Sequence, residues 1–203
     1  MIAGSGPSLA AMVRQSIPFC QVIAVNGAVH QVQADHWFTL DPSTANRDRM
    51  RRPIPGVRYW AAVPPDYGTP SAQTAEMRTP ADAHVTYLQR LVGDGTLGSR
   101  PGLSSDPGAI HTGNSAYGAL GLAYLMGARR IVLVGVDGAG GYHGAAGAPR
   151  DLRHLPDLFA SAVPQLASAG VQVVNASMES TIQCFPKMRF KEALRWMWQT
   201  ASA

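Results

Sequence analysis

Short apolar runs alternate along the chain with polar or amphipathic segments of helical length. Successive residues of a strand point to opposite faces, so a run in which all of them are apolar is typical of a strand buried between two layers. Strands that alternate with helices pair in parallel, because each helix carries the chain back across the sheet. The pattern predicts an α/β fold, a Rossmann-like three-layer sandwich with a mostly parallel sheet. The expected strands cover residues 2–4, 21–28, 36–42, 57–63, 129–138 and 171–177.

The segments between these runs predict helices with recognisable ends. Gly127 closes a small-residue segment as a C-terminal cap, whereas Pro156 lies in the first turn of a later helix and Pro164 kinks it. The expected helices cover residues 8–16, 44–51, 115–128, 152–168 and 187–200. The last one is amphipathic. Its apolar face is expected to consist of Phe190, Leu194, Met197 and Trp198.

The stretch 64–110 is the least regular part of the chain. It is rich in Pro, Gly, Ser and Thr, and only 85–89 shows a weak strand pattern. An irregular stretch of this length is typically a lid or an insertion, unless it contains elements that the pattern does not reveal. We therefore expect a single domain over residues 1–203 with an irregular insertion or lid at about 64–110.

The composition fits one globular domain, because hydrophobic residues make up 46% of the 203 residues. The formal net charge is +4, and the basic residues are arginines except for Lys187 and Lys191. This modest positive excess suits phosphate-bearing ligands, from nucleotides to nucleic acid, and fits an ordinary basic surface equally well.

Cys20 and Cys184 have neither metal-ligand spacing nor a nearby partner, which favours free thiols in a reducing compartment. The sequence shows no N-terminal signal and no apolar run of about 18 residues. It therefore predicts a cytoplasmic protein without a membrane partner. The histidine and carboxylate spacings typical of metal sites do not occur either, so no metal site is expected.

Small, hydrogen-bonding residues follow most of the predicted strands. Ligands of open parallel sheets bind outside the carboxyl ends of the strands, so these residues are expected to meet at one edge. Two of the clusters, GSGPS and TGNS, also open helices, whose N-termini attract phosphate. Each cluster alone fits a plain turn, but the set favours a nucleotide or phosphosugar site. Its members are Gly4, Ser5, Gly6, Pro7, Ser8, Asn26, Asp41, Thr112, Gly113, Asn114, Ser115 and Asp137.

His143 is the expected general base. It lies in a glycine-rich loop after the strongest predicted strand, and an imidazole titrates near neutrality. An ordinary loop histidine fits the same pattern.

Several motifs, in one order, resemble a known group of enzymes. They are IAGSGPSL, VIAVNGA, TGNSAYGALGLAYLMGARRIVLVGVDG and VVNASMESTIQCFP. The chain resembles the bacterial CMP-sialic-acid-dependent sialyltransferases of the Campylobacter type. It is also similar to small bacteriophage and prophage proteins of unknown function and to the archaeal 6-hydroxymethylpterin pyrophosphokinase group. The resemblance covers residues 1–42 and 111–186.

The resemblance implies that these loops hold a cytidine nucleotide. The sialyltransferases hold the donor phosphate with tyrosines, use a histidine as base and need no metal. Tyr142 and His143 would play these parts here. This implies a metal-independent transferase of phage or prophage type with a nucleotide-activated donor, most simply a glycosyltransferase. The nucleotide or nucleotide-sugar donor would be a substrate, with no tightly bound cofactor, and a phage-encoded protein would act in the host cytoplasm.

Other functions and partners stay open at this point. An ATP-dependent diphosphotransferase of the pterin pyrophosphokinase type and a non-catalytic nucleotide-binding protein are the alternatives. The acceptor is a modified DNA base or a glycan. The arginines of 47–52 offer a route to a nucleic acid, although such a run also fits a solvated helix face. Trp196 and Trp198 pack either in the core or against a second copy, which would make a homo-oligomer.

Overall fold

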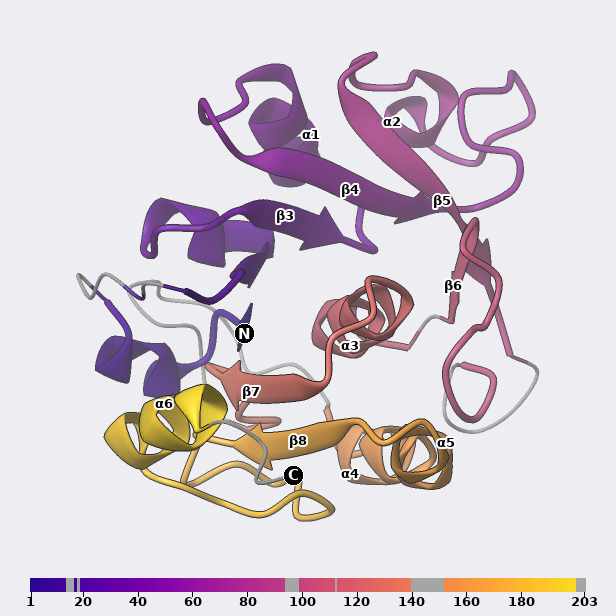
Figure 1. The fold of residues 1–203 in the computed structure, drawn as a ribbon. Coiled ribbons are helices and arrows are strands. Elements are labelled where there is room, and N and C mark those ends of the chain that lie inside the picture. The colour runs from indigo at the N-terminus through magenta and orange to yellow at the C-terminus, as the bar shows by residue number, and fades with distance from the viewer. Residues whose placement is uncertain (14–16, 18, 94–98, 112, 140–151, 200–203) are drawn as a thin grey trace.

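One parallel sheet organises the structure, a computed structural model that describes residues 1–13, 17, 19–93, 99–111, 113–139 and 152–199 (Figure 1). Within these residues eight strands pair side by side in the order β6-β5-β4-β3-β2-β1-β7-β8, and every pair is parallel. The predicted α/β sandwich is confirmed. The strands are β1 (Ile2–Ala3), β2 (Ile23–Val25), β3 (His36–Thr39), β4 (Arg58–Val63), β5 (Val85–Leu91), β6 (Ala109–His111), β7 (Arg130–Val134) and β8 (Gln172–Asn175).

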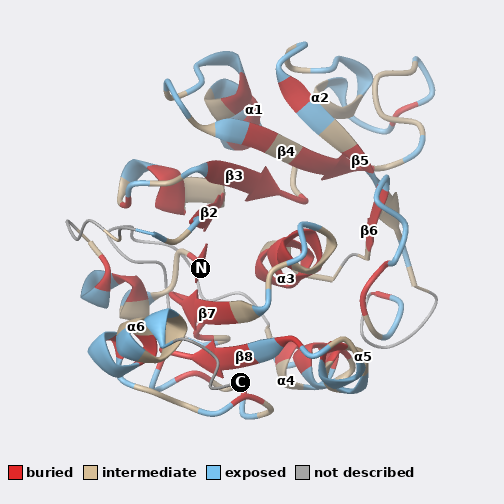
Figure 2. Ribbon diagram, viewed as in Figure 1, coloured by how far each residue is buried: buried red, intermediate tan, exposed pale blue. Residues whose placement is uncertain are grey.

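Helices cover both faces of the sheet, because successive side chains of a buried strand point to opposite faces. Ile2 belongs to one core with α3, α4 and α5, whereas Ala3 belongs to the other, with α1 and α6. Figure 2 shows the strands as largely buried and the outer helix surfaces as exposed. The helices are α1 (Thr44–Arg51), α2 (Ala75–Arg78), α3 (Ser115–Leu125), α4 (Leu155–Ala160), α5 (Val163–Ser168) and α6 (Phe190–Trp198), with short 3-10 helices at η1 (Pro7–Ala11) and η2 (Asn26–His30). No described helix is long and apolar enough to cross a membrane.

The two predicted proline signals fall at the starts of helices. The expected helix 152–168 is two helices, α4 and α5, with Pro156 and Pro164 each in a first turn. Proline fits there because the first N–H groups of a helix have no partner inside it. The predicted kink at Pro164 is therefore a break. Gly127 has a φ of 78°, the left-handed conformation of a C-terminal cap, as predicted.

The last helix was predicted with one wrong residue on its apolar face. Phe190 is buried, and Leu194 and Met197 pack against the same core. Trp198 is 45% exposed, and Trp196 packs against the core instead. The sequence analysis therefore assigned Trp198 wrongly to the apolar face of this helix.

The stretch 64–110 contributes two strands to the sheet and the four-residue helix α2. The weak strand predicted at 85–89 is β5, which runs over Val85–Leu91. The second strand, β6, has only three residues and was not predicted from the sequence. It pairs with the last residues of β5 and is the outermost strand on that side of the sheet.

Both cysteines are free and half-buried, as expected. Burial raises the pKa of the Cys184 thiol to about 11, so this thiol stays protonated near neutral pH.

The small-residue helix α3 lies directly on the sheet because a glycine faces β3. A β-carbon on Gly118 would lie 2.7 Å from a ring carbon of Phe38 and 3.2 Å from a methyl group of Leu40. Phe38 is fully buried, so its ring has no room to move aside. Gly121, in the same helix, has its nearest neighbour at an ordinary 3.5 Å from the position of an added β-carbon.

We predict that Gly118→Ala lowers the free energy of unfolding by about 1–3 kcal/mol, because the methyl group overpacks a filled core. Gly121→Ala is the matched control and should raise it by about 1 kcal/mol, because alanine favours the helix and the space exists. Urea unfolding followed by circular dichroism measures both. Equal effects of the two changes would contradict this account of how α3 packs.

His36 is fully buried at the start of β3 as a neutral ring. Its Nδ1 accepts a hydrogen bond from Trp60 Nε1 at 3.2 Å, which leaves Nε2–H to donate to Gln21 Oε1 at 3.3 Å. Burial and, to a lesser extent, the charge of Arg58 hold the pKa of His36 below its ordinary value of 6.5. A proton on Nδ1 would face the Trp60 N–H, so the charged ring does not fit this site.

We predict that the protein loses stability as the pH falls below about 6.5, because the unfolded chain then binds a proton that folded His36 resists. In His36→Gln this part of the loss should disappear. Unfolding free energies measured by urea titration from about pH 7.5 to about pH 5 test the difference. A wild-type and a variant curve with the same slope would show that His36 is not the group responsible.

Candidate functional site

The order of the strands reverses at β1, which makes β1 the switch point of the carboxyl edge, the side of the sheet on which the carboxyl ends of the strands lie. Strands β2 to β6 follow one another on one side of β1, whereas β7 and β8 lie on the other side. The loops that leave β1 and β7 therefore turn to opposite faces. In open parallel sheets, ligands bind at such a switch point.

The GSGPS loop after β1 is fastened to β7 by its own backbone. Gly4 N–H donates to the Val134 carbonyl and Gly6 N–H to the Gly135 carbonyl, both at 2.8 Å. The Ser8 N–H donates to Asp137 Oδ2 at 3.0 Å. Proline at position 7 has no N–H group. The N–H groups of residues 4, 6 and 8 are thus used inside the protein, and the loop serves as a docking turn rather than as a phosphate cradle built from them.

Serine hydroxyls extend this fastening to β8. Ser8 Oγ accepts a hydrogen bond from Gly135 N–H at 3.0 Å and donates to Ser177 Oγ at 2.6 Å. Ser177 Oγ in turn accepts from Val136 N–H at 3.2 Å. The ends of β1, β7 and β8 therefore form one rigid corner. Ser177 follows β8. The sequence analysis expected small polar residues after the strands but did not assign this contact to Ser177.

Glycine is required at the point where the two loops meet. A β-carbon on Gly4 would lie 2.3 Å from the Gly135 carbonyl oxygen, and a β-carbon on Gly6 would lie 2.2 Å from Asp137 Oδ2. Gly135 itself has a φ of 68°, which disfavours other residues. The glycines of the motif thus allow β1 and β7 to approach closely.

Asp137 has an unpaired carboxylate oxygen at this switch point. The residue is only 8% exposed. Its Oδ2 accepts from Ser8 N–H, but Oδ1 is buried and has no hydrogen-bond partner among the described residues. A buried polar atom without a partner destabilises the folded state, so it is uncommon in structural positions. Oδ1 is a hydrogen-bond acceptor that the fold itself does not use.

Asn26 and Asp41 belong to a closed network at the ends of β2 and β3. Asn26 Oδ1 accepts from Thr39 Oγ1 at 2.7 Å and from Asn46 Nδ2 at 3.1 Å. Asn46 Nδ2 also donates to the Asp41 carbonyl at 2.7 Å, and Asp41 Oδ1 accepts from Ser43 N–H at 3.1 Å. Asn26 takes the left-handed conformation, with a φ of 51°. These contacts give both residues a structural role at the edge.

Ser5 and Ser115 connect neighbouring elements along the same edge. Ser5 Oγ donates to the Val25 carbonyl at the end of β2, at 3.2 Å. Ser115 Oγ, at the first residue of α3, accepts from the Leu40 N–H just after β3, at 3.3 Å. The start of α3 therefore sits beside the ends of β2 and β3.

Asn114 and Gly113 shape the turn into α3. Asn114 is the N-cap, and its Oδ1 accepts from Ala116 N–H at 2.7 Å. Gly113 has a φ of 106°, and its carbonyl accepts from His154 Nε2 at 3.2 Å. The TGNS motif thus opens a helix as the sequence predicted.

Two arginines, neither of them among the predicted site residues, add unpaired donors to this edge. Arg47 is 3% exposed, and its Nη1 donates to the Tyr67 hydroxyl and, at 2.9 Å, to the Glu76 carbonyl. Its Nη2 is buried without a partner in the described structure. Burial raises the pKa of Tyr67 to about 12, so this phenol stays neutral and does not offset the charge of Arg47.

Arg90, the penultimate residue of β5, is the second of these arginines. Its Nε is buried and has no hydrogen-bond partner in the part of the chain that the structure describes. Burial lowers the pKa of Arg90, and the negative charge of Asp41 opposes this shift.

The unpaired buried atoms belong to three different elements spread along the carboxyl edge of the sheet. Among the described residues three buried side-chain polar atoms lack a partner: Arg47 Nη2, Arg90 Nε and Asp137 Oδ1. Arg47 lies in the helix that follows β3, Arg90 lies at the end of β5, and Asp137 follows β7. All three thus lie at the carboxyl edge, where a parallel sheet binds its ligands.

The described residues predicted for the site all lie along this edge. They are Gly4, Ser5, Gly6, Pro7, Ser8, Asn26, Asp41, Gly113, Asn114, Ser115 and Asp137. Thr112, Tyr142 and His143 lie outside the described residues. The sequence missed Arg90 because an arginine inside a strand pattern carries no motif. It noted Arg47 only as one of a basic run, and burial distinguishes Arg47 from the exposed Arg51 and Arg52 of that run.

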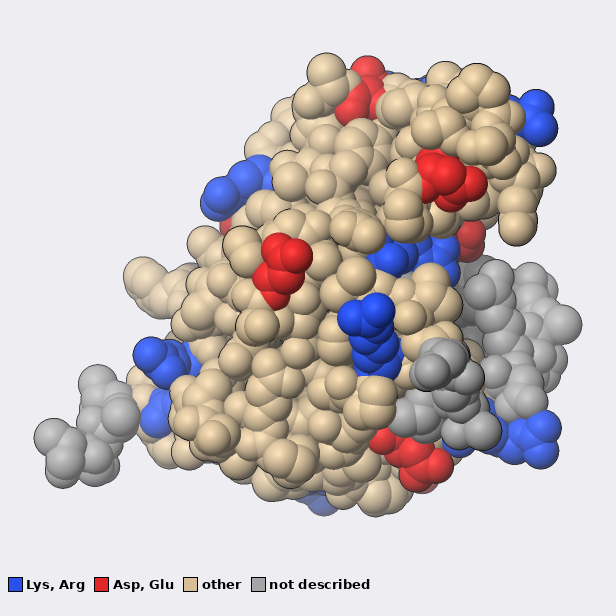
Figure 3. All heavy atoms as spheres, turned by 90° about the vertical axis from the view of Figure 1, so that its right-hand side faces the viewer, with Lys and Arg blue, Asp and Glu red and all other residues tan. Residues whose placement is uncertain are grey.

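The described part of the chain brings no three His, Cys, Asp or Glu side chains together in a way that could hold a metal ion. Figure 3 shows basic and acidic side chains scattered over one side of the molecule, with no continuous basic patch among its described residues. No protein-family model, curated protein or solved structure matches this chain.

We predict that Asp137→Asn keeps the free energy of unfolding at or above the wild-type value. Asparagine retains an oxygen for the Ser8 N–H and removes a buried charge. Asp137→Ala should lower it by about 1–3 kcal/mol, because the Ser8 N–H loses its acceptor. Urea unfolding near neutral pH compares the three proteins. A loss in Asp137→Asn as large as in Asp137→Ala would show that the charge itself holds the corner together.

Proposed function

We propose that the chain binds a nucleotide-type ligand at the carboxyl edge and is a transferase that uses a nucleotide-activated donor, most simply a glycosyltransferase. The observation that carries the binding part is that every unpaired buried polar side-chain atom of the described residues lies at this edge. The transferase part comes from the sequence resemblance.

The unpaired atoms specify the chemistry of a ligand. Asp137 Oδ1 requires a hydrogen-bond donor, such as a ribose or sugar hydroxyl. Arg90 Nε and Arg47 Nη2 require acceptors, and their positive charges favour phosphate or carboxylate oxygens. A molecule with hydroxyl groups at one end and anionic groups at the other satisfies both requirements. Nucleotides and nucleotide sugars have this composition.

The position of the two charge types gives the ligand an orientation. Asp137 lies at the β1–β7 switch point, whereas Arg90 lies four strands beyond β1 in the sheet order. Strands are spaced by about 4.8 Å, so an extended molecule is needed to reach from one towards the other. The proposed ligand lies along the edge, with its hydroxyl-bearing end at Asp137 and its anionic part towards α1 and β5.

In the proposed reaction, the bond between the transferred sugar carbon and the donor phosphate oxygen breaks, and a bond from the acceptor hydroxyl oxygen to that carbon forms. The electron pair of the broken bond stays on the phosphate, and in this proposal the guanidinium of Arg90 stabilises the added charge. The proton of the acceptor hydroxyl passes to a base, for which His143 is the candidate from the sequence.

We expect calorimetric titration with a panel of cytidine, uridine and adenosine nucleotides to show saturable binding of one class. Asp137→Asn and Arg90→Gln should each weaken this binding by about 10- to 100-fold, because each removes a charged hydrogen-bonding group from the site. Ser115→Trp should abolish it, because an indole at the start of α3 would fill the edge. Arg51→Gln is the matched control, because Arg51 is exposed on the same helix as Arg47.

The titrations also test the chemistry of the donor. A preference for cytidine nucleotides that persists in a metal chelator supports the sialyltransferase-like reaction. A preference for ATP that requires Mg²⁺ would replace the proposed transfer by diphosphate transfer. Equal binding in Ser115→Trp and the wild type would remove the carboxyl edge as the site.

A further inference from the structure

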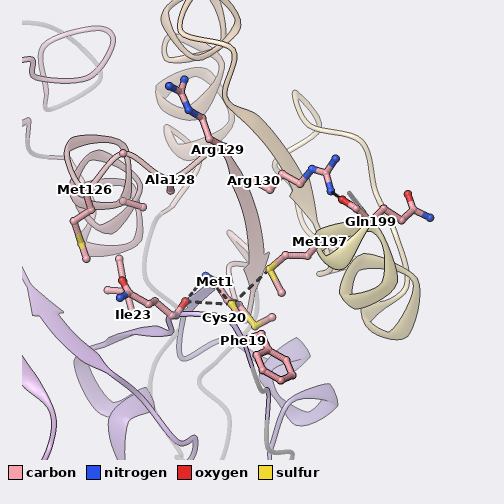
Figure 4. Close-up of a pocket in the computed structure, with 13 residues that line it drawn as sticks. Met1, Phe19, Cys20, Ile23, Met126, Ala128, Arg129, Arg130, Met197 and Gln199 are labelled. Atoms are coloured by element: carbon pink, nitrogen blue, oxygen red, sulfur yellow. Dashed lines mark hydrogen bonds between the residues drawn. The ribbon is translucent and has the colours of Figure 1, made fainter. Parts of the chain in front are cut away.

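A cavity lies at the opposite, amino edge of the sheet and does not belong to the site described above (Figure 4). Its volume is about 480 Å³. It is bounded by the starts of β1, β2 and β7, the end of α3 and the end of α6. Small-molecule sites typically have volumes of about 300–1,000 Å³, so this cavity has the size of a binding pocket.

The walls of the cavity are mainly apolar and adaptable. Met1, Met126 and Met197 come from three different elements, and Figure 4 shows Met126 and Met197 on opposite sides of the pocket. Ile23 and Ala123 complete the apolar wall. Methionine side chains are flexible and polarisable, so they adjust to ligands of varied shape. These walls suit an aliphatic chain rather than a rigid polar molecule.

Apolar surface continues from the pocket to its mouth. Phe19, which lines the cavity, is 98% exposed, and Met126 is 38% exposed. Phe19 also has a φ of 59°, a conformation that costs energy for a residue with a side chain. The fold thus holds an aromatic ring in water beside an apolar pocket.

Among the described lining residues the charged side chains are those of Arg129 and Arg130, with no Asp or Glu. The α-ammonium group of Met1, another lining residue, is also positive and donates to the Gln21 carbonyl at 2.6 Å. Arg130 lies over the Trp196 ring at 5.5 Å, and its Nη1 donates to the carbonyls of Trp196 and Gln199. Both of these bonds use Nη1, which leaves Nε and Nη2 of the same guanidinium as donors toward a ligand as far as the described residues are concerned.

The end of α3 at this rim is capped by its own backbone. The N–H groups of Met126, Gly127 and Ala128 donate to carbonyls of the last turns of the helix. The formal charges of the described lining are therefore the two guanidinium groups and the Met1 ammonium group, all of them positive.

We propose that this pocket binds a single-chain amphiphile with an anionic head, of which a medium-chain carboxylate is the simplest example. The chain lies among the methionines, and the carboxylate is bound by Arg130 at the rim. A second copy of this protein fits less well, because its own arginines would meet the same arginines across a two-fold axis. The proposal is independent of the function proposed for the carboxyl edge.

The test titrates the protein with decanoate, decanol and acetate below the micelle concentration, with binding measured by calorimetry. We expect decanoate to bind about tenfold more tightly than decanol, which corresponds to one charged hydrogen bond, and acetate not to bind. Arg130→Gln should abolish the preference for decanoate but retain decanol binding. Met126→Trp should weaken both by tenfold or more, because the indole fills the pocket. Ser115→Trp, at the other edge, is the control that should bind decanoate normally.

Several outcomes would overturn the proposal. They are the absence of saturable decanoate binding, equal affinities for decanoate and decanol in the wild type, and unchanged binding in Met126→Trp. Loss of both ligands in Arg130→Gln would mean that Arg130 only supports the wall through its contacts with α6. A dimer in sedimentation that Met126→Trp dissociates would identify a second copy as the occupant.

Discussion

The contact between the loop after β1 and the end of β7 is the constraint on which the rest of the architecture depends. β1 contributes only two residues to the sheet, yet it joins the five strands on one side to the two on the other. So short a strand supplies few ladder hydrogen bonds, and the backbone bonds from Gly4 and Gly6 to β7 add to them. The close approach of Gly4 and Gly135 makes these bonds possible and leaves no space for a β-carbon. The same contact holds Asp137 beside the loop after β1, so the integrity of the sheet and the geometry of the candidate site have one origin.

The two edges of the sheet present different chemistry, although both consist of element ends. The carboxyl edge gathers polar side chains, some of them closed into networks and a few left without partners. The amino edge carries an apolar cavity with a basic rim. A parallel sheet separates its two edges by the full length of its strands, so ligands at the two edges do not compete for the same residues. This division supports reading the unpaired atoms and the apolar cavity as two separate sites.

The sequence was sufficient for the fold class and for most element positions. Continuous apolar runs identified five of the strands after β1, and the cap at Gly127 and Pro156 marked real helix boundaries. Pro164 begins a separate helix where the sequence predicted only a kink. It was insufficient for β6, because three residues carry no periodicity. It also placed Trp198 on the wrong face, since one extra residue at a helix end moves a side chain by about 100°.

For the site, the sequence located the loops but not the roles of the residues in them. Motif position correctly brought Gly6, Asn26, Ser115 and Asp137 to one edge, because strand ends in a parallel sheet share that edge. Which polar atoms are satisfied by the fold depends on partners far away in the chain, such as Ser8 for Asp137. The sequence therefore did not separate Asn26, whose oxygen is fully engaged, from Asp137, whose second oxygen is not.

The long separation in sequence between β1 and its partner β7 has a consequence for biosynthesis. Strand β7 ends about 130 residues after β1, at Val134, so a nascent chain emerging from the ribosome exposes an unpaired central strand until most of the domain has been made. Until β7 has been synthesised, one side of β1 stays unpaired. If the middle segment is translated slowly, this unpaired strand is available to aggregation and to chaperones for longer.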